Sequence, residues 1–365
     1  MGFRYRAVEN LVMTPGFWRG RRVFLTGHTG FKGSWLALWL SELGAEVTGF
    51  ALPPATTPNL FSVAGVENTL DSVLGDLRDA GHLRVALARA QPEILFHLAA
   101  QALVAEGYAD PVGTYATNVM GAVHLLEAAR QPNVMEKLKV IVFVTSDKCY
   151  ENVESCTAYA ESAPLGGYDP YSSSKACAEI LAASWRRSFF NAPEAPRIAT
   201  ARAGNVIGGG DWAAHRLVPD LLAALAAGET PCLRHPESVR PWQHVLEPLA
   251  GYLTLAEQCI THREWASAWN FGPDAADCVS VARLAELLCQ LWPEPRRYAV
   301  QPSALPHEAG LLYLDASRAR RHLGWRPRWR LEEALRETVA WHCAWRNGAD
   351  MNAQCRQQIQ RYSAS

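Results

Sequence analysis

The stretch "RRVFLTGHTGFKGSWLALWLSELG" (residues 21–44) decides the fold of this chain. It begins with a short apolar run that ends in glycine, typical of a buried parallel strand. It continues with apolar residues three and four apart, typical of a helix that Gly44 closes. Gly27, Gly30 and Gly33 stand between the two, where a tight turn lets the backbone approach a pyrophosphate at the helix N-terminus. A dinucleotide-binding turn is therefore predicted, with an ordinary strand–helix connection as the alternative.

Strands and helices alternate beyond this unit. The pattern predicts further strands within 45–52, 71–79, 92–100, 138–146 and 197–208, and helices over 79–91, 114–131 and 171–190. Such alternation gives a parallel sheet with helices on both faces. We therefore expect an α/β fold, a Rossmann-like doubly wound parallel sheet.

The alternation stops after about residue 205, where Gly, Pro and Trp become frequent. Helices near 281–292 and 331–346 indicate a smaller C-terminal substrate-binding α/β domain. The expected organisation is an N-terminal extension (1–18), a dinucleotide-binding Rossmann domain (19–205), a mainly substrate-binding domain with some segments returning to the first (206–350) and a polar tail (351–365).

The composition excludes several classes of partner. The formal net charge of −1 provides no global field that recruits nucleic acid or an anionic membrane. No apolar stretch is long enough to cross a bilayer. The nine cysteines form no CxxC pair and no metal-like spacing with histidine. We expect no metal site, reduced thiols and a cytoplasmic protein without a signal peptide.

The end of the second predicted strand does not reveal the cofactor. It reads "GFALPP", with neither the acidic residue that binds the adenosine ribose of NAD nor an arginine for the 2′-phosphate of NADP. Asp76, after the third strand, is a candidate partner for the adenine amino group. A helix N-cap is an equally good interpretation of Asp76.

Tyr171 and Lys175 lie four residues apart on a predicted helix, so their side chains share one face. An ammonium beside a phenol stabilises the phenolate and lowers its pKa. Tyr171 can then take a proton from a substrate hydroxyl, and Lys175 can also bind the nicotinamide ribose. An exposed helix pair is the alternative.

A hydroxyl, a carboxylate and an amine follow the apolar run 140–144 on consecutive residues, Ser146, Asp147 and Lys148. Desolvating an Asp–Lys pair costs free energy, so such a pair is expected at the mouth of a site rather than inside a core. A surface salt bridge at a strand end is the alternative.

Longer motifs closely resemble the CDP-glucose 4,6-dehydratases of the extended short-chain dehydrogenase/reductase superfamily. They are "GHTGFKGSWLALWL" (27–40), "HLAAQ" (97–101), "TSDKCYEN" (145–152), "GGYDPYSSSKACAE" (166–179), "RAGNVIGGGDW" (202–212), "RPWQHVLEPLAGYL" (240–253) and "WNFGP" (269–273). The resemblance covers about residues 17–350. It implies a tightly bound NAD that is recycled within each turnover, a nucleotide-sugar substrate and a homodimer.

The resemblance also implies roles in the reaction. Tyr171 takes the O4 proton while a hydride passes from C4 to NAD, and Ser146 helps to bind that oxygen. Lys148 then removes the C5 proton and Asp147 protonates the departing C6 hydroxyl, before the hydride returns to C6. Burial favours a neutral lysine and a protonated aspartate, whereas their mutual attraction opposes both, so the two are expected to titrate as a pair.

The remaining expected site residues bind ligands. Arg240 is expected to clamp the diphosphate with two parallel hydrogen bonds. Asn205 is expected to donate to phosphate, and Lys32 either contacts phosphate or faces solvent. The expected cofactor-binding residues are Gly27, Gly30, Phe31, Lys32, Gly33, Asp76, Leu77, Ala99, Tyr171 and Lys175, and the expected substrate-binding residues are Gln101, Asn205, Arg240 and Asn270.

Three positions depart from the family pattern: Ala105, Ala160 and His215. The first two are expected in loops near the sugar or base, so the type of reaction is a firmer inference than the nucleotide. The alternatives are a nucleotide-sugar epimerase, a dehydratase acting on another nucleotide hexose, and a non-catalytic binding relative. An epimerase has no use for an acid–base pair at C5 and C6, and a binding protein need not keep the catalytic set. The expected product serves deoxysugar and surface-polysaccharide biosynthesis.

Overall fold

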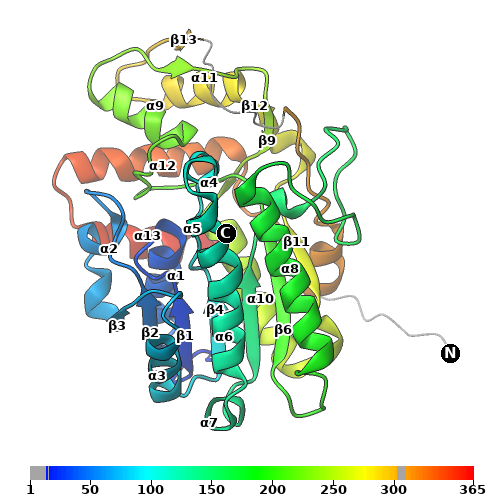
Figure 1. The fold of residues 1–365 in the computed structure, drawn as a ribbon. Helices are drawn as coiled ribbons and strands as arrows, with labels where there is room; N and C mark the ends of the chain where they lie inside the picture. The colour runs from blue at the N-terminus through cyan, green and yellow to red at the C-terminus, as the bar shows by residue number, and fades with distance from the viewer. Residues whose placement is uncertain (1–13, 15, 302–309) are drawn as a thin grey trace.

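The computed structural model describes residue 14 and residues 16–301 and 310–365. Its centre is a seven-stranded sheet in the order β11-β6-β5-β4-β1-β2-β3 (Figure 1), and all of its pairings are parallel. The strands are β1 (Arg22–Thr26), β2 (Glu46–Ala51), β3 (Asp71–Leu74), β4 (Ile94–His97), β5 (Val140–Val144), β6 (Arg197–Ala203) and β11 (Ala268–Phe271). The predicted doubly wound sheet is confirmed. Its order reverses between β1 and β4, where doubly wound folds bind ligands beyond the carboxyl ends of the strands.

The central strands β4 and β5 are buried on both faces, as the unbroken apolar run of β5 requires, whereas the edge strand β3 is largely exposed. Along β5, Val140, Val142 and Val144 enter one core cluster, while Ile141 and Phe143 enter the other. The helices over the second face are α3 (Ala80–Ala90), α6 (Gly121–Ala129) and α8 (Pro170–Ser188). Those over the first face are α1 (Phe31–Glu42) and α10 (Leu246–Thr261).

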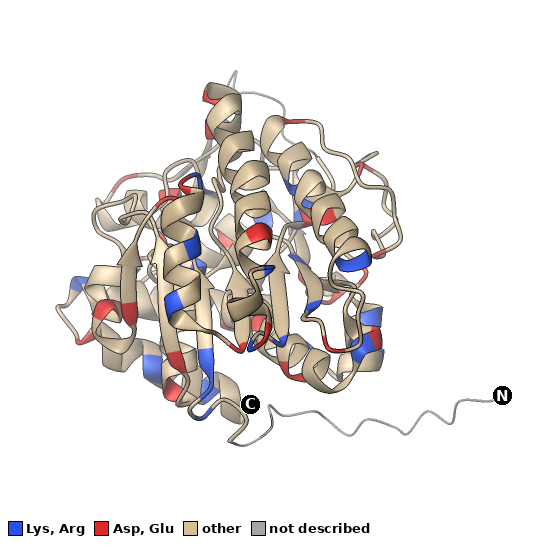
Figure 2. Cartoon of the chain, turned by 60° about the horizontal axis from the view of Figure 1, so that its bottom comes forward, with Lys and Arg blue, Asp and Glu red and all other residues tan. Residues whose placement is uncertain are grey.

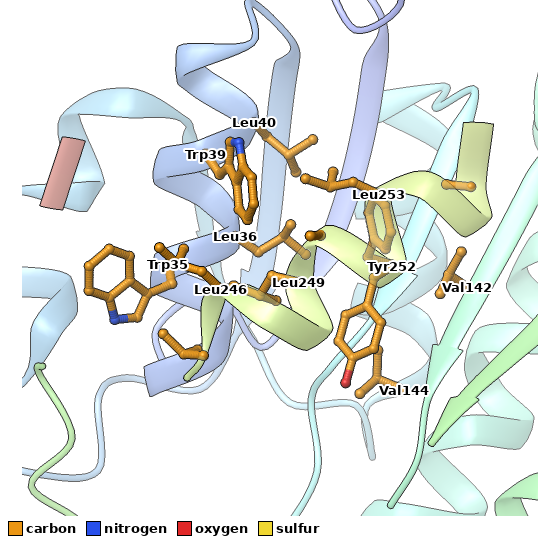
Figure 3. Close-up of a cluster of buried hydrophobic side chains, with 14 of the residues drawn as sticks. Trp35, Leu36, Trp39, Leu40, Val142, Val144, Leu246, Leu249, Tyr252 and Leu253 are labelled. Carbon is orange, nitrogen blue, oxygen red and sulfur yellow. The ribbon is translucent and has the colours of Figure 1, made fainter. Parts of the chain in front are cut away.

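Helices α1 and α10 meet in the largest core cluster (Figure 3). Leu36 and Leu40 of α1 point toward α10, which presents Leu249 and Leu253 to them (Figure 3). At the far side of α10, Tyr252 lies between that helix and β5 (Figure 3). Helix α10, from the second half of the chain, thus completes the core of the sheet domain and supports β5, the strand that leads into the Ser146–Lys148 segment.

A smaller unit lies over the carboxyl ends of the strands (Figure 1). Its helices α9 (Leu217–Ala226), α11 (Val281–Leu291) and α12 (Leu331–Arg346) share a separate core. Helix α10 and strand β11, although they lie within 206–350, belong to the large sheet domain. The short strands are β7 (Val206–Ile207), β8 (Cys232–Leu233), β9 (Val239–Pro241), β10 (Gln243–His244), β12 (Cys278–Ser280) and β13 (Ala299–Val300).

The expected polar tail at 351–365 is wrong. Residues Met351–Ala364 form helix α13, which buries Met351, Cys355, Ile359 and Tyr362 against the first core cluster. Polar residues dominate its composition, but an apolar residue at every third or fourth position gives it one buried face. Most of the expected N-terminal extension, residues 1–13 and 15, lies outside the described residues.

The remaining helical segments are short. They are α2 (Leu60–Val63), η1 (Val66–Thr69), α4 (Val104–Ala109), α5 (Pro111–Tyr115), η2 (Ala116–Met120), α7 (Pro132–Met135), η3 (Asp147–Cys149), η4 (Arg263–Trp265), η5 (Ala275–Asp277) and η6 (Ala319–Leu323). Basic and acidic positions are interleaved along the elements (Figure 2). None of the helices in the described part of the chain has both the length and the apolar character needed to span a bilayer.

Candidate active site

Two glycines of the turn after β1, Gly27 and Gly33, leave no room for a side chain. Gly27 has φ +80°, and a Cβ there would lie 2.7 Å from the backbone nitrogen of Ala99. A Cβ on Gly33 would lie 2.0 Å from the Gly27 carbonyl oxygen. Among the described residues no side chain caps α1 at Gly30, so the N–H groups of Phe31 and its neighbours in the first turn are open to an anion. The turn fits a pyrophosphate.

Asp76 follows β3, so it lies at the carboxyl ends of the parallel strands, as the glycine turn does. Its carboxylate accepts hydrogen bonds from the Arg78 backbone and guanidinium, the shortest being 2.6 Å. The guanidinium hydrogen bond holds the pKa of Asp76 below its usual value. Asp79, not Asp76, caps helix α3, so the N-cap interpretation of Asp76 is wrong. The neighbouring Leu77 is buried.

A cavity of about 410 Å³ opens between the carboxyl ends of the strands and the smaller unit. It brings together most of the residues expected to act on or bind the substrate, from separate parts of the chain. Ser146, Asp147, Lys148, Tyr171, Asn205 and Arg240 line it, together with Lys32. Gln101, Lys175 and Asn270 are not in its lining.

The Ser146–Lys148 segment is organised by its own hydrogen bonds. The Ser146 hydroxyl accepts from the backbone nitrogen of Lys148 at 3.2 Å and donates to Asp147 Oδ1 at 2.9 Å. Asp147 is buried, and its Oδ2 has no hydrogen-bond partner among the described residues. Burial raises the pKa of Asp147, against the opposing charges of Lys148 and Arg240. The aspartate is therefore biased toward its proton-carrying form.

The expected lowering of the Tyr171 pKa is wrong. Burial raises the pKa of Tyr171 to about 12, and a hydrogen bond with Ser146 only partly offsets this. Lys175, one turn further along α8, is itself buried, which lowers its pKa to about 8, while Cys149 and Glu179 oppose that shift. In this environment Tyr171 is protonated at neutral pH, so its use as a base requires additional positive charge near the phenol.

Lys32 lines the cavity instead of facing solvent. It follows Phe31 in the first turn of α1 and lies within electrostatic reach of Asp147. Burial, and then the charge of Arg216, lower the pKa of Lys32 to about 7, against the attraction of Asp147. Burial therefore disfavours the charged form of Lys32, which lies between the glycine turn and the cavity.

Arg240 approaches the cavity from β9. Its side chain is buried, and Nη1 donates to the carbonyl oxygens of Val239 at 3.0 Å and Gly310 at 3.2 Å. These bonds fix the guanidinium beside the cavity that Asn205 also lines.

Sequence reasoning missed two further arginines in the lining, Arg216 and Arg234. Arg216 forms an ion pair of 3.1 Å with Asp211, and Arg234 lies 3.7 Å from Asp220. Arg216 lies directly before α9 and Arg234 lies beyond it, and no sequence motif marked either as a site residue.

Two expected substrate residues lie outside the cavity lining and bond other parts of the protein. The Asn270 side chain is fully buried: its Oδ1 accepts from the Tyr150 hydroxyl, and its Nδ2 donates to the carbonyl oxygens of Tyr159 and Asp315. The Gln101 amide bonds Thr114 and the Leu103 backbone. The structure brings neither residue to the cavity, because neighbouring backbone and side chains already use their polar atoms.

The three departures from the family pattern fall in different places. Ala105 and His215 line the cavity, whereas Ala160 does not. His215 adopts a left-handed backbone conformation, with φ +64°. Among the described residues, no group of three or more His, Cys, Asp or Glu side chains is placed to hold a metal ion.

Comparison with known proteins identifies the family. The family model described as GDP-mannose 4,6 dehydratase matches residues 24–338. The chain belongs to the GDP-mannose 4,6 dehydratase family. Within the family it is 47% identical to a CDP-glucose 4,6-dehydratase of Salmonella typhimurium over 359 residues, 97% of this chain and 99% of that protein. It is 25% identical to the dTDP-glucose 4,6-dehydratase 1 of Escherichia coli, over 88% of this chain and 92% of that protein.

Solved structures resemble this family member in fold. A UDP-glucose 4-epimerase of Thermotoga maritima has a TM-score of 0.75 and 23% identity, covering 89% of this chain and 99% of its own. A double mutant of the dTDP-glucose 4,6-dehydratase of Streptomyces venezuelae has a TM-score of 0.73 and 23% identity, covering 90% and 99%. Because both an epimerase and a dehydratase share the fold, the fold does not select between these reactions.

Proposed function

We propose that the chain is a CDP-glucose 4,6-dehydratase, which converts CDP-D-glucose to CDP-4-dehydro-6-deoxy-D-glucose and water. The observation that carries the proposal is the convergence of Ser146, Asp147, Lys148 and Tyr171 on one cavity. The choice of nucleotide rests on the 47% identity to the Salmonella typhimurium enzyme over nearly the whole chain.

The proposed cofactor is NAD. The crowded turn at Gly27 and Gly33 and the open N-terminus of α1 suit its pyrophosphate, and the proposed adenine partner is Asp76. When bound, NAD would supply the hydride acceptor for C4 and the hydride donor for C6. The positive charge of its oxidised ring would also favour a Tyr171 phenolate.

The residues of the cavity divide the proton transfers between them. Ser146 and Tyr171 bind the O4 hydroxyl, and Tyr171 takes its proton as C4 becomes a ketone. This ketone acidifies the C5 proton, which Lys148 removes, while Asp147 protonates the C6 hydroxyl, which leaves as water. The raised pKa of Asp147 supports its role as the acid. C5 regains a proton when C6 receives its hydride. C4 is oxidised and C6 is reduced, so the overall reaction is a redox-neutral loss of water.

The substrate diphosphate is proposed to lie on the basic side of the cavity. Arg240 is buried and oriented by two carbonyl oxygens, which preorganises it for an anion. Asn205 also lines the cavity, and its side-chain amide is the proposed hydrogen-bond donor to the diphosphate.

The experiment that tests this function is incubation with CDP-glucose, followed by proton NMR. A dehydratase produces a C6 methyl doublet, an epimerase produces only a new sugar hydroxyl configuration, and a binding protein produces neither. Parallel reactions with UDP-, dTDP- and GDP-glucose identify the nucleotide. Absence of a methyl signal with all four substrates would reject the dehydratase assignment.

The protein is further proposed to be a cytoplasmic homodimer. Val112, Met120 and Ile180 are exposed apolar side chains on α5, η2 and α8, which pack beside one another on the outer side of the sheet domain (Figure 1). Burying such side chains favours association with a second copy. Free exposed thiols at Cys156 and Cys232 suit a reducing compartment.

A further inference from the structure

A buried carboxylate, Glu179 of α8, lies outside the lining of the cavity and gathers three donors. Its Oε1 accepts from the Thr145 hydroxyl at 2.5 Å. Its Oε2 accepts from the Thr200 hydroxyl at 2.7 Å and from Arg202 Nη2 at 2.8 Å. All four side chains are at most 5% exposed, so these hydrogen bonds form away from competing water.

Arg202 extends the cluster toward the catalytic segment. Its Nη1 donates to the Tyr150 hydroxyl at 2.8 Å, and its guanidinium lies 4.9 Å from the centre of the Tyr150 ring. The Tyr150 hydroxyl in turn donates to Asn270 Oδ1 at 2.7 Å. Burial alone lowers the pKa of Arg202, but the hydrogen bond and charge of Glu179 outweigh it, so this guanidinium remains charged.

The Glu179–Arg202 ion pair bonds one residue on each side of the catalytic segment Ser146–Lys148. Thr145 immediately precedes Ser146, and Tyr150 follows Lys148 by two residues. On α8, Glu179 stands one turn beyond Lys175 and two turns beyond Tyr171, on the same face. One carboxylate therefore connects the strand-end segment to the helix that carries the other catalytic pair.

Stability does not explain this arrangement. A buried ion pair costs about as much to desolvate as it returns, and well-packed apolar residues often match or exceed its contribution. Directional bonds from one carboxylate to separate elements do fix relative position, which proton transfers require within a fraction of an ångström.

We propose that Glu179 is a positioning residue of the reaction. Through Thr145 on one side and through Arg202 and Tyr150 on the other, it holds the Ser146–Lys148 segment at the distance from Tyr171 that the successive proton transfers need. The inference rests on the proposed dehydratase function, because only that reaction uses both catalytic groups on one sugar.

The test removes single hydrogen bonds and leaves the ion pair in place. Removing Glu179 alone would leave the buried charge of Arg202 unpaired and destabilise the fold. Thr145→Val and Tyr150→Phe each release one flank of the catalytic segment. Thr200→Val is the matched control, since it removes an equally buried hydroxyl from the same carboxylate, but in the middle of β6. Thr145→Ser keeps the hydroxyl and is the conservative rescue.

We expect kcat for methyl formation to fall roughly 10- to 100-fold in Thr145→Val and Tyr150→Phe, because displacement of a reacting group by about 1 Å costs this much. KM should stay within about 2-fold, since the nucleotide contacts are untouched. Thr200→Val should lose a similar amount of thermal stability while keeping kcat within about 2-fold, and Thr145→Ser should regain most of the rate.

Two results would overturn the inference: wild-type kcat in folded Thr145→Val and Tyr150→Phe, or an equal loss of kcat in Thr200→Val, which would make the cluster merely structural. If Thr145→Val does not fold, Tyr150→Phe decides by the same criteria. The wild-type protein is assayed alongside the variants. If the proposed dehydratase function is wrong, the wild type forms no methyl group from any nucleotide hexose; if only the positioning role of Glu179 is wrong, the wild type does form it.

Discussion

Asp147 is buried and lines the cavity, and its Oδ2 has no hydrogen-bond partner within the described part of the chain. Its Oδ2 lies so close to Gly204 that a Cβ on that glycine would be 2.7 Å away. The carboxyl is thus held against backbone on one side, with Lys32, Lys148 and Arg240 within electrostatic reach. Desolvation favours the protonated carboxyl over the carboxylate, which suits a residue that must donate a proton to a departing hydroxyl.

Asp147→Asn should reduce kcat by roughly 10²- to 10⁴-fold, the usual loss for a general acid. Because the raised pKa keeps the acid form available, wild-type kcat should decline as the pH rises through the pKa of Asp147. The residual rate of the variant should lack this alkaline decline. A pH–rate profile of both proteins measures the effect, and an unchanged alkaline limb in Asp147→Asn would remove Asp147 from the acid role.

Arg240→Ala should mainly raise KM. A contact with a diphosphate remote from the reacting carbons is made equally in the ground and transition states, so its loss weakens binding uniformly. The expected cost is roughly 2–5 kcal/mol for a desolvated charge pair. Steady-state kinetics with CDP-glucose measure it.

Arg336→Ala is the control for this measurement, because Arg336 forms its ion pairs with Glu332 and Glu333 on the surface of α12. An unchanged KM in Arg240→Ala would exclude a substrate contact.

At the scale of elements, a buried carboxylate of α10 links that helix to the C-terminal helix α13. Glu247 of α10 accepts hydrogen bonds from the backbone nitrogens of Arg328 and Trp329 and from the Tyr362 hydroxyl of α13. Burial raises the pKa of Glu247 to about 7, although these bonds oppose the shift. The folded protein therefore binds this proton more tightly than the unfolded chain does.

The sign of the resulting pH dependence follows from linkage. A raised folded-state pKa contributes stability below about pH 4.5, the ordinary value, and this contribution is lost as the pH rises to about 7. Glu247→Gln, which cannot ionise, should therefore gain stability relative to the wild type over that range. Urea unfolding of both proteins at each end of it measures the difference. A difference in unfolding free energy that does not change with pH would contradict the buried-acid assignment.

The sequence predicted the helices and strands better than the burial and contacts of individual side chains. Apolar runs such as 140–144 and the glycine turn are patterns of neighbouring residues. The sheet and its dinucleotide-binding turn could therefore be predicted from the sequence. The burial of Asn270, the raised pKa of Tyr171 and the helical order of 351–364 depend on residues distant in the chain. Arg216 was missed because only the fold carries the start of α9 to the catalytic segment.

For the whole molecule, the proposed homodimer gives a direct prediction. Ile180 and Val112 are 56% and 78% exposed, and an Ile180→Glu substitution places a charge in the proposed interface. Sedimentation velocity should show a dimer for the wild type and a shift toward monomer for Ile180→Glu. Val300→Glu, at an exposed apolar site of 52% on β13, should remain dimeric. A monomeric wild type would refute the proposed assembly.

Lys148 is proposed to be the base that removes the C5 proton, and the Lys148→Ala variant assayed in heavy water tests this role. Tyr171 and Lys175 remain in this variant, so oxidation at C4 should survive, whereas neither deuterium at C5 nor a C6 methyl should form, with a loss of roughly 10²- to 10⁴-fold. Tyr171→Phe should instead block oxidation itself, and Lys139→Ala, exposed at the other end of β5, should behave as the wild type. Deuterium incorporation and methyl formation in Lys148→Ala at nearly the wild-type rate would exclude Lys148 as this base, because another group would then have to remove the C5 proton.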